Sequence, residues 1–351
     1  MHEIARAKPV PPRRRFTPTE SLEAAAARGW PAREQATLGD WLLRATDGWT
    51  QRANSALAIG SPDLPTPDAI DFVQQWYRQR SLIPALSIPV PLFQRLDDEL
   101  ERRGWTAMPT TQVMTVSLPT LLTALSGHAA DTSPTTSPAA APPGTPPSAA
   151  APPRQADDAS PTTSPSAAAQ PGQPASFTDQ DGTSPAISPS ATTPSAASDG
   201  PSFAEDEPET AGSPGGRIEL ATEPSAEWLS AVAGRKGPLP DSARHVLTAV
   251  PNVRFAQWYD EQGTLLATAR GCVADDESRW LGLSLIGVDE RMRRRGLAQR
   301  LIAALAEWAV TLGARDAYLQ VEQRNTAAVA LYSRLGFTVH HIYSSRRLLT
   351  D

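Results

Sequence analysis

The sequence has very little cysteine and no long apolar run. Cys272 is the single cysteine among 351 residues, which excludes an internal disulfide framework and a zinc site built from several cysteines. Its position in a strand of alternating apolar residues predicts a buried structural thiol rather than a nucleophile. No apolar stretch approaches the length needed to cross a bilayer, and none follows the N-terminal basic residues as a secretory signal would require. We therefore expect a soluble, cytoplasmic protein without a membrane partner.

The chain also has little excess charge. Its formal net charge of −6 is small for its length, and the first residues are instead basic: Arg6, Lys8, Arg13, Arg14 and Arg15. Such an arm can contact nucleic acid, but a short solvated tail is the more common role, so no nucleic-acid partner is expected. We also expect no metal site, because no histidine is accompanied by clustered carboxylates or cysteine.

Proline and glycine, 35 and 22 residues respectively, are distributed unevenly and indicate the domain boundaries. Residues 126–216 consist mainly of Ala, Pro, Ser, Thr and Gly, with Phe177 and Phe203 as the only aromatic residues. Such a segment cannot bury enough apolar area to offset chain entropy, so it is predicted to be a disordered linker; a docking or modification segment is the alternative. The predicted organisation is therefore a basic arm (1–19), a first folded domain (20–125), the linker (126–216) and a second folded domain (217–351).

The most informative segment is a basic turn that follows an apolar run. After the run 280–288, the chain reads Arg293-Arg294-Arg295-Gly296-Leu297-Ala298 and continues as an amphipathic helix. Backbone N–H groups at a helix N-terminus, the helix dipole and nearby arginines together suit an anion such as a pyrophosphate. A solvated basic first turn is the alternative interpretation.

Periodicity and caps predict the remaining elements of the second domain. Strands are expected at 217–221, 253–259, 264–273, 280–288, 317–322 and 338–348, with helices from residue 224, over 241–249, after residue 296 and after Asn325. Ser225 and Asn325 are predicted to be N-caps, and Gly336 to follow the last helix as its C′ residue.

Two motifs in this order resemble those of the GNAT acetyltransferases. Arg293-x-x-Gly296-x-Ala298 resembles motif A, and Asn325-x-x-Ala-x-x-Leu-Tyr332-x-x-Leu-Gly336-Phe resembles motif B. The resemblance implies an α+β fold, with a mixed and mostly antiparallel sheet flanked by helices, that binds acetyl-CoA where two central parallel strands splay. It implies that the Ile286 N–H polarises the thioester carbonyl, that the main chain at Val288 and the Asn325 side chain hold pantetheine, and that the turn residues Arg293, Arg294, Arg295, Gly296, Leu297 and Ala298 hold the pyrophosphate.

The resemblance also implies a general acid for the reaction. Tyr332 matches the tyrosine that protonates the leaving thiolate in many relatives, although its helical position also suits a core residue. Many relatives carry a carboxylate at the position of Gly282, so direct carboxylate catalysis from there is in doubt. Glu322, at the end of its strand, is the candidate base, acting directly or through water, with a solvated strand-end residue as the alternative. His340 and His341 are adjacent on a strand, so only one of them can face the site.

The sequence pattern of the first domain resembles that of the second only weakly. Five tryptophans between residues 30 and 105 predict a real core, but the basic glycine turn is missing. The chain resembles the tandem GNAT proteins of actinobacterial type, which implies a degenerate N-terminal half. We expect a hairpin over residues 41–55, helices over 67–80 and 92–103, and a strand over 84–90. Arg44, Arg52 and Asn54 are candidates for an acceptor pocket or for structural roles.

The resulting hypothesis is an acetyl-CoA-dependent N-acetyltransferase that acts on a primary amine of a protein or a small molecule. The alternatives are an inactive acyl-CoA-binding sensor and a mycothiol-synthase-like enzyme that acetylates a small amino-sugar conjugate. The acceptor and the oligomeric state stay open, because acceptor pockets in this fold are built from loops.

Overall fold

The structure, a computed structural model, describes residues 16–130, 215–274 and 279–349. Most of the predicted basic arm and most of the predicted linker lie outside these residues. Helix α4 (Leu118–Ala130) extends past residue 126, where the linker was predicted to begin.

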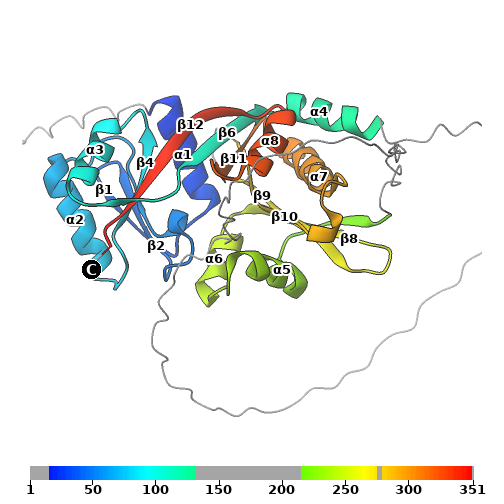
Figure 1. The fold of residues 1–351 in the computed structure, drawn as a ribbon, viewed down its shortest axis with the longest axis horizontal. Coiled ribbons are helices and arrows are strands. Elements are labelled where there is room, and N and C mark those ends of the chain that lie inside the picture. Colours follow the sequence, from blue (N-terminus) through cyan, green and yellow to red (C-terminus); the bar gives the residue numbers. More distant parts are fainter. Residues whose placement is uncertain (1–15, 131–214, 275–278, 350–351) are drawn as a thin grey trace, which may run out of the picture. The chain divides into compact units, whose positions relative to one another are not determined.

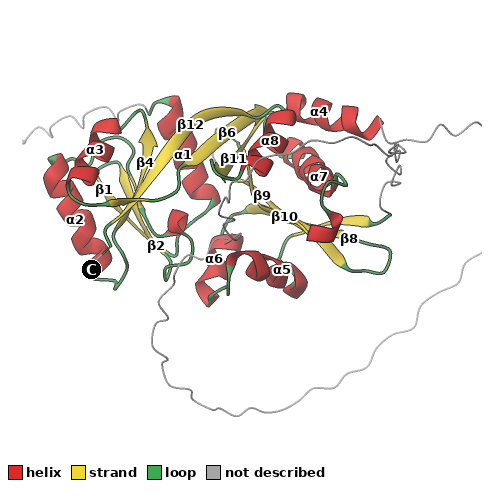
Figure 2. Ribbon diagram, viewed as in Figure 1, coloured by secondary structure: helices red, strands yellow, loops and turns green. Residues whose placement is uncertain are grey.

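The C-terminal half has the predicted order of strands and helices. Figures 1 and 2 show its elements, which are β7 (Arg217–Ala221), α5 (Ala226–Lys236), α6 (Asp241–Thr248), β8 (Asn252–Tyr259), β9 (Leu265–Val273), β10 (Leu281–Val288), α7 (Leu297–Thr311), β11 (Asp316–Glu322), α8 (Thr326–Arg334) and β12 (Thr338–Arg347). The predicted caps are confirmed. Ser225 Oγ accepts a hydrogen bond from the Trp228 N–H at 3.0 Å, and Gly336, with φ 86°, directly follows Leu335, the C-cap of α8.

The N-terminal half contains elements of the same kinds. They are α1 (Pro18–Gly29), β1 (Glu34–Leu38), β2 (Trp41–Ala45), β3 (Ala56–Leu57), α2 (Thr66–Arg78), β4 (Ala85–Val90), α3 (Gln94–Arg102), β5 (Thr106–Ala107), β6 (Thr111–Ser117) and α4. The expected strand and two helices are confirmed as β4, α2 and α3. Helices α1 and α4 and strand β6 were not predicted.

The predicted hairpin over residues 41–55 is wrong in its second strand. Strand β2 pairs along its whole length with β1, and residues 51–53 form a 3₁₀ turn instead. The Asn54 side chain explains this conformation, because it accepts from the N–H groups of Thr46 and Gly48 and donates to the carbonyls of Trp49 and Thr50. Such side-chain bonds to the backbone compete with strand pairing.

The two halves exchange strands within one sheet. Its order is β1-β2-β3-β4-β12-β6-β11-β10-β9-β8-β7, with β5 pairing β12 off this path. Strand β6 of the N-terminal half lies between β11 and β12, and β12 of the C-terminal half lies between β4 and β6 (Figure 1). Each half therefore completes the sheet of the other.

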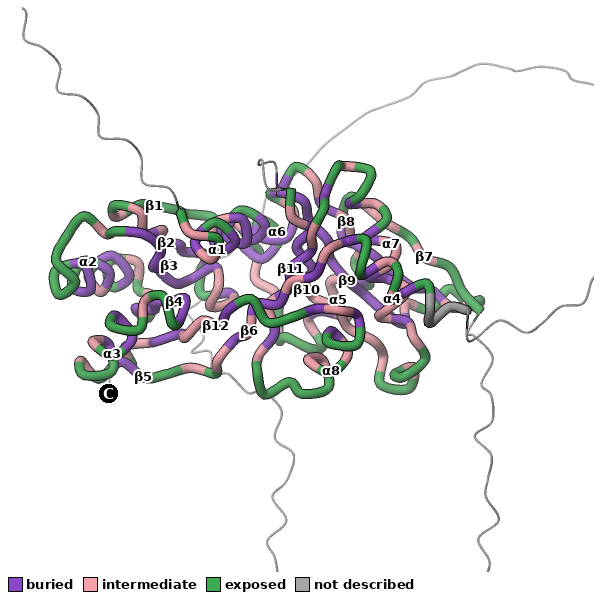
Figure 3. The backbone as a smooth tube through the Cα atoms, turned by 90° about the horizontal axis from the view of Figure 1, so that it is seen from above, coloured by how far each residue is buried: buried purple, intermediate pink, exposed green. Residues whose placement is uncertain are grey.

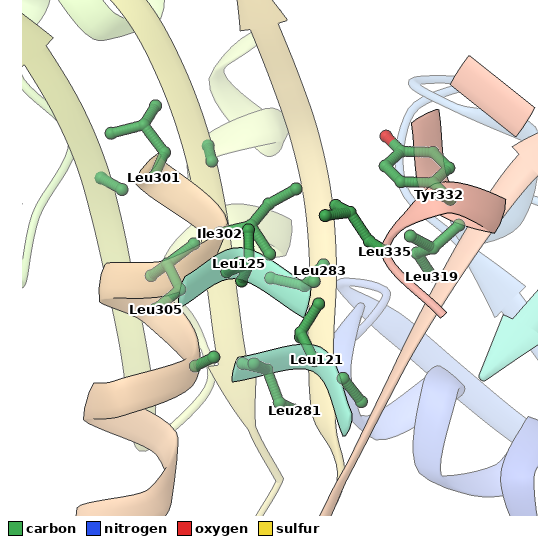
Figure 4. Close-up of a cluster of buried hydrophobic side chains, with 14 of the residues drawn as sticks. Leu121, Leu125, Leu281, Leu283, Leu301, Ile302, Leu305, Leu319, Tyr332 and Leu335 are labelled. Atoms are coloured by element: carbon green, nitrogen blue, oxygen red, sulfur yellow. The ribbon is translucent and has the colours of Figure 1, made fainter. Parts of the chain in front are cut away.

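The sheet of the C-terminal half is buried on both faces. On β9, Ala267, Ala269 and Val273 join the core beneath α7 and α8, whereas Cys272 joins the core beneath α5 and α6. We call these the α7 face and the α5 face. Figure 3 shows that buried residues follow the strands, and Figure 4 shows the leucine-rich core of the α7 face. Cys272 is 3 % exposed and its thiol lies 3.4 Å from the Gly29 carbonyl, which fits the predicted structural role.

Candidate active site

The central parallel strands separate halfway along their length. Strand β10 pairs with β11 only from Leu281 to Leu283, opposite Ala317 to Leu319. Beyond Leu283, β10 remains paired with β9 but has no partner in β11. Residues 284–288 are half-buried, in contrast to the buried start of the strand. The predicted splay of β10 and β11 is therefore present beyond Leu283 and Leu319.

A bulge in β10 lies where the strands separate. The register with β9 skips from Ser284 to Gly287, and Leu285 has a φ of 53°, which a side chain rarely adopts. Ile286 therefore has no partner residue in the register of either neighbouring strand. A bulge of this kind redirects backbone groups, and at this position it turns the Ile286 peptide out of the ladder.

The basic turn begins α7 in the conformation that anion binding needs. Arg294 and Gly296 are both left-handed, with φ values of 63° and 76°, and Gly296 is the N-cap. No acidic residue lies in the first turn, and Leu297 is 1 % exposed and anchors the turn in the core. The first amide groups of a helix have no partner within it, so they remain available to an anion.

The three arginines of the turn are not equivalent. Arg293 forms a salt bridge with Glu290 at 3.0 Å, which reduces the positive charge it adds. Arg294 and Arg295 are exposed. Ala298 is half-buried one residue inside the helix.

Motif B places Asn325 and Tyr332 at the start and on the inner side of α8. Asn325 Oδ1 accepts from the Ala328 N–H at 3.2 Å, so its capping role is confirmed. Tyr332 is 8 % exposed, and its ring lies 5.9 Å from that of Phe337. Figure 4 shows its hydroxyl pointing away from Leu335 and Leu319. Burial raises the pKa of Tyr332 to about 12, so the phenol stays protonated at neutral pH.

Glu322 lies on the α5 face, at the end of β11. The strand alternates, and Leu319 and Val321 are on the α7 face. The Glu322 carboxylate accepts a hydrogen bond from Arg324 Nε at 2.6 Å, and its side chain is 39 % exposed. This arrangement leaves the candidate base at the rim of the splay, on the face opposite Tyr332.

Tyr318 explains why position 282 carries no side chain. A Cβ at Gly282 would collide with the Tyr318 ring, whose Cζ would lie 2.7 Å away. Burial raises the pKa of Tyr318, so its hydroxyl is neutral. The place of the carboxylate expected from the resemblance is therefore taken by a phenol. The pairing of Gly282 with Tyr318 follows from the parallel register, which the sequence alone does not show.

Of the two histidines, His341 is buried and His340 is exposed. His341 Nε2 lies 2.8 Å from Glu23 Oε1, and His341 Nδ1 lies 2.9 Å from His340 Nδ1. The side chains of His341 and Glu23 are 3 % and 5 % exposed. His341 thus ties β12 to α1.

In the N-terminal half, the region equivalent to the basic turn is unsuited to an anion. Helix α2 begins with Thr66, Pro67 and Asp68. Proline has no N–H to donate, and the aspartate opposes negative charge at this end of the helix. The candidates Arg44 and Asn54 have structural partners: Arg44 is 3 % exposed and donates to the Ser55 carbonyl and hydroxyl. Arg52 instead stacks on Trp30, with its Cζ 4.6 Å from the ring centre.

Comparison with known proteins agrees with this geometry. A family model described as "Probable histone acetyltransferase Rv0428c C-terminal" matches residues 19–143 and 193–346, which is most of the chain. The chain belongs to this family, within the GNAT superfamily. The two matched stretches of this GNAT protein contain both halves of the exchanged sheet, so it is of the tandem type.

Individual relatives support the same assignment over shorter stretches. An "Uncharacterized N-acetyltransferase YobR" of Bacillus subtilis is 34 % identical over 131 residues, which are 36 % of this chain and 51 % of the relative. A "Mycothiol acetyltransferase" of Amycolatopsis mediterranei is 34 % identical over 97 residues, which are 24 % of this chain and 32 % of the relative. The GNAT chain thus spans about half or less of the curated relatives it matches.

A solved structure shares the fold of the described residues. The structure described as "GCN5-related N-acetyltransferase from Kribbella flavida" covers 95 % of this chain and 96 % of its own, at 14 % identity and a TM-score of 0.53. In the part of the chain that the structure describes, no helix has the length and apolar character of a membrane span.

Proposed function

We propose that the protein is an N-acetyltransferase that transfers the acetyl group of acetyl-CoA to a primary amine. The observation that carries the proposal is the combination of three features along β10 and its connection to α7: the splay of β10 and β11, the bulge at Leu285 and the left-handed turn into α7. Membership of an acetyltransferase family supports it.

The donor is proposed to bind from the α7 face. Its pyrophosphate meets the amide groups from Arg294 to Ala298, with Arg294 and Arg295 adding positive charge and Arg293 contributing less because of its bond to Glu290. Pantetheine extends along Val288 as an added strand, and Asn325 contacts it with the amide nitrogen that its capping bond leaves free for a partner.

In the proposed reaction, the amine nitrogen attacks the thioester carbon while the Ile286 N–H stabilises the oxygen. The C–S bond breaks, and the thiolate takes a proton from Tyr332, which burial keeps protonated. The amine's own proton leaves to a base. Glu322 remains the candidate for that base, directly or through water, because it lies on the opposite face at the rim of the splay. Because Tyr318 fills the space at Gly282, the base is not expected to act from that strand.

An acyl-CoA-binding sensor is the second candidate, and the observation that favours it is the phenol in place of a carboxylate at position 282. A sensor binds acetyl-CoA but releases no CoA thiol when amines are added. The names of the family and of the relatives differ, with "histone acetyltransferase" for the family and "Mycothiol acetyltransferase" for one relative, so they do not decide the acceptor.

Calorimetric titration with acetyl-CoA tests the proposal. The wild type should bind, and Gly296→Glu should abolish binding, because the new side chain adds bulk and negative charge where the pyrophosphate approaches. Gly313→Glu is a matched control, since Gly313 has nearly the same φ of 79° but lies at the other end of α7. Intact protein that binds no acetyl-CoA, or equal loss in both variants, would refute the proposed donor site.

A further inference from the structure

A row of polar side chains crosses the α5 face beside the splay. Arg270 on β9 is paired with Ser284 on β10, and Gln320 on β11 follows one residue beyond the last paired position of β10 and β11. Residues directly opposite in adjacent strands point to the same face. Cys272 on β9 and Tyr318 on β11 both lie away from the α7 face. Side chains two residues apart in a strand point to the same face, so Arg270 and Gln320 also lie on the α5 face.

Each of these three residues has a buried polar atom without a hydrogen-bond partner among the residues that the structure describes. The atoms are Arg270 Nη2, Ser284 Oγ and Gln320 Oε1. An unsatisfied buried polar atom costs about 1–3 kcal/mol, so three of them in one row are costly unless something polar completes them. The row includes a cation, a hydroxyl and an amide.

Arg270 is a buried cation without a carboxylate partner in the described part of the chain. It is 1 % exposed, its Nε donates to the Leu247 carbonyl at the end of α6, and its Cζ lies 5.3 Å from the Trp30 ring centre. Carbonyls at a helix C-terminus and an aromatic face partly stabilise a guanidinium, but they do not neutralise it.

A second arginine reaches the same face from α5. Arg235 Nη2 donates to Thr268 Oγ1 at 2.6 Å, and its guanidinium lies against Gly287, where any Cβ would collide with it. Thr268 is two residues from Arg270 on β9, a separation of about 7 Å along one face of a strand. In the described residues, Thr268 is the only side chain to which Arg235 is hydrogen-bonded, and no carboxylate pairs with it.

Two carboxylates of this region already have partners. Glu23 is bonded to His341, and Glu322 to Arg324. Arg52 adds another cation on the Trp30 ring. The α5 face next to the bulge is therefore positively charged, which suits an anion and disfavours a lysine-rich peptide.

We propose that the acceptor is a primary amine that carries an oxyanion, a carboxylate or a phosphate, and that Arg235 binds this group beside the bulge while Arg270 adds its charge from beneath. This inference rests on the proposed function, because it assigns the acceptor to the α5 face, opposite the donor. Thr268 holds the guanidinium in place, and Gly287 leaves room for it.

Binding of matched probes tests the inference without requiring turnover. Protein saturated with CoA, which cannot react, is titrated with O-phosphoethanolamine against ethanolamine, with β-alanine against β-alaninamide, and with a lysine-rich peptide. We expect at least one oxyanion probe to bind about 10-fold or more tightly than its matched amine without the oxyanion, as a charge-assisted hydrogen bond would give. The pair that shows the preference tells phosphate from carboxylate.

Arg235→Gln should remove the preference by weakening the binding of the oxyanion probe alone. Arg235→Lys should keep part of the preference. Arg244→Gln is the control for net charge, because Arg244 is exposed on α6 and paired with Glu223. Absence of any preference in the wild type, tighter binding of the lysine-rich peptide, or a preference that survives in Arg235→Gln would overturn the inference. CoA affinity, measured first, reports separately on the proposed function, and the probes are also titrated into CoA-free protein.

Discussion

Position 282 has no side chain because Tyr318 occupies the space in front of it. This single contact has two effects at the site. It removes the strand position from which a carboxylate could act, and it places a neutral phenol beside Cys272 and Gly29 where α1 meets the sheet. A residue pair of this kind is invisible in the sequence, because 36 residues separate the partners and only the parallel register brings them together.

Tyr332 is the residue whose role can be tested most directly. The helical pattern fits a core tyrosine and an acid equally well, and burial with a pKa of about 12 is compatible with both roles. If Tyr332 protonates the thiolate, Tyr332→Phe should slow the chemical step by about 10²-fold or more, while acetyl-CoA affinity and stability change little. Rapid-quench single-turnover measurements report this step. An unchanged rate, with chemistry limiting, would assign Tyr332 to packing alone.

At the scale of elements, α7 and α2 show how two equivalent helices diverge. Helix α7 begins at a left-handed glycine after three arginines, whereas α2 begins with Thr66, Pro67 and Asp68. Both helices pack an apolar side on the sheet, so the fold keeps α2 although its first turn has lost the features that attract an anion. The first turn of α2 therefore differs from that of α7 in the features that attract an anion, although both helices pack on the sheet.

Several elements with local signals were predicted, whereas β6, which depends on distant partners, was not. Helix α1 was also missed, although Thr17 and Glu20 form a capping box at its start. Ser225, Asn325 and Gly336 mark helix ends through bonds within a few residues, so the helix boundaries in the C-terminal half were close. Strand β6 was missed because both its partners, β11 and β12, come from the other half. Arg235 and Arg270 were missed as site residues for a similar reason, because their role depends on which residues of neighbouring elements they contact in the folded chain.

Helix α3 is joined to β12 by a buried ion pair that should set part of the acid sensitivity. Arg346 donates to both oxygens of Asp97 at 2.9 Å and holds the pKa of that carboxyl below its usual range. Asp97→Asn should cost about 3 kcal/mol of unfolding free energy at pH 7, since it leaves the buried Arg346 with the exposed Glu101 as its remaining carboxylate in the described residues. The contribution of the Asp97 carboxylate to stability is complete above its pKa in the unfolded chain, near 3.9. It disappears as the pH falls through the lower pKa of Asp97 in the folded protein.

Urea unfolding at pH 7 and at pH 3 measures this difference. The difference in unfolding free energy between wild type and Asp97→Asn should be smaller at pH 3 than at pH 7. Asp71→Asn serves as the control, because the Asp71–Arg103 pair has a similar distance of 2.8 Å but the Asp71 side chain is 65 % exposed, so its loss should cost under about 1 kcal/mol. Equal costs for both variants, or a gap independent of pH, would contradict this account.

At the scale of the molecule, the exchange of β6 and β12 makes the two halves dependent on each other. Removing β6 would leave β11 and β12 with unpaired edges in the middle of a buried sheet, and such edges favour aggregation. The exchange also brings residues of both halves to the α5 face, where Trp30 from one half packs on Arg270 from the other. The acceptor side proposed for the GNAT reaction is therefore built by both halves, although every residue proposed to contact the donor comes from the C-terminal half.

Cutting the chain between the halves should not separate them. A specific protease site inserted near residue 170 would break the covalent link and leave every pairing of β6 with β11 and β12, and of β12 with β4, in place. We expect the two fragments to co-elute in size-exclusion chromatography and to keep acetyl-CoA affinity. Their unfolding midpoint should now fall on dilution, because the unfolded state has become two molecules. Residues 215–351 expressed alone should instead aggregate. Fragments that separate in native buffer at micromolar concentration, or a soluble and well-folded C-terminal half, would show that the exchanged strands are not what holds the molecule together.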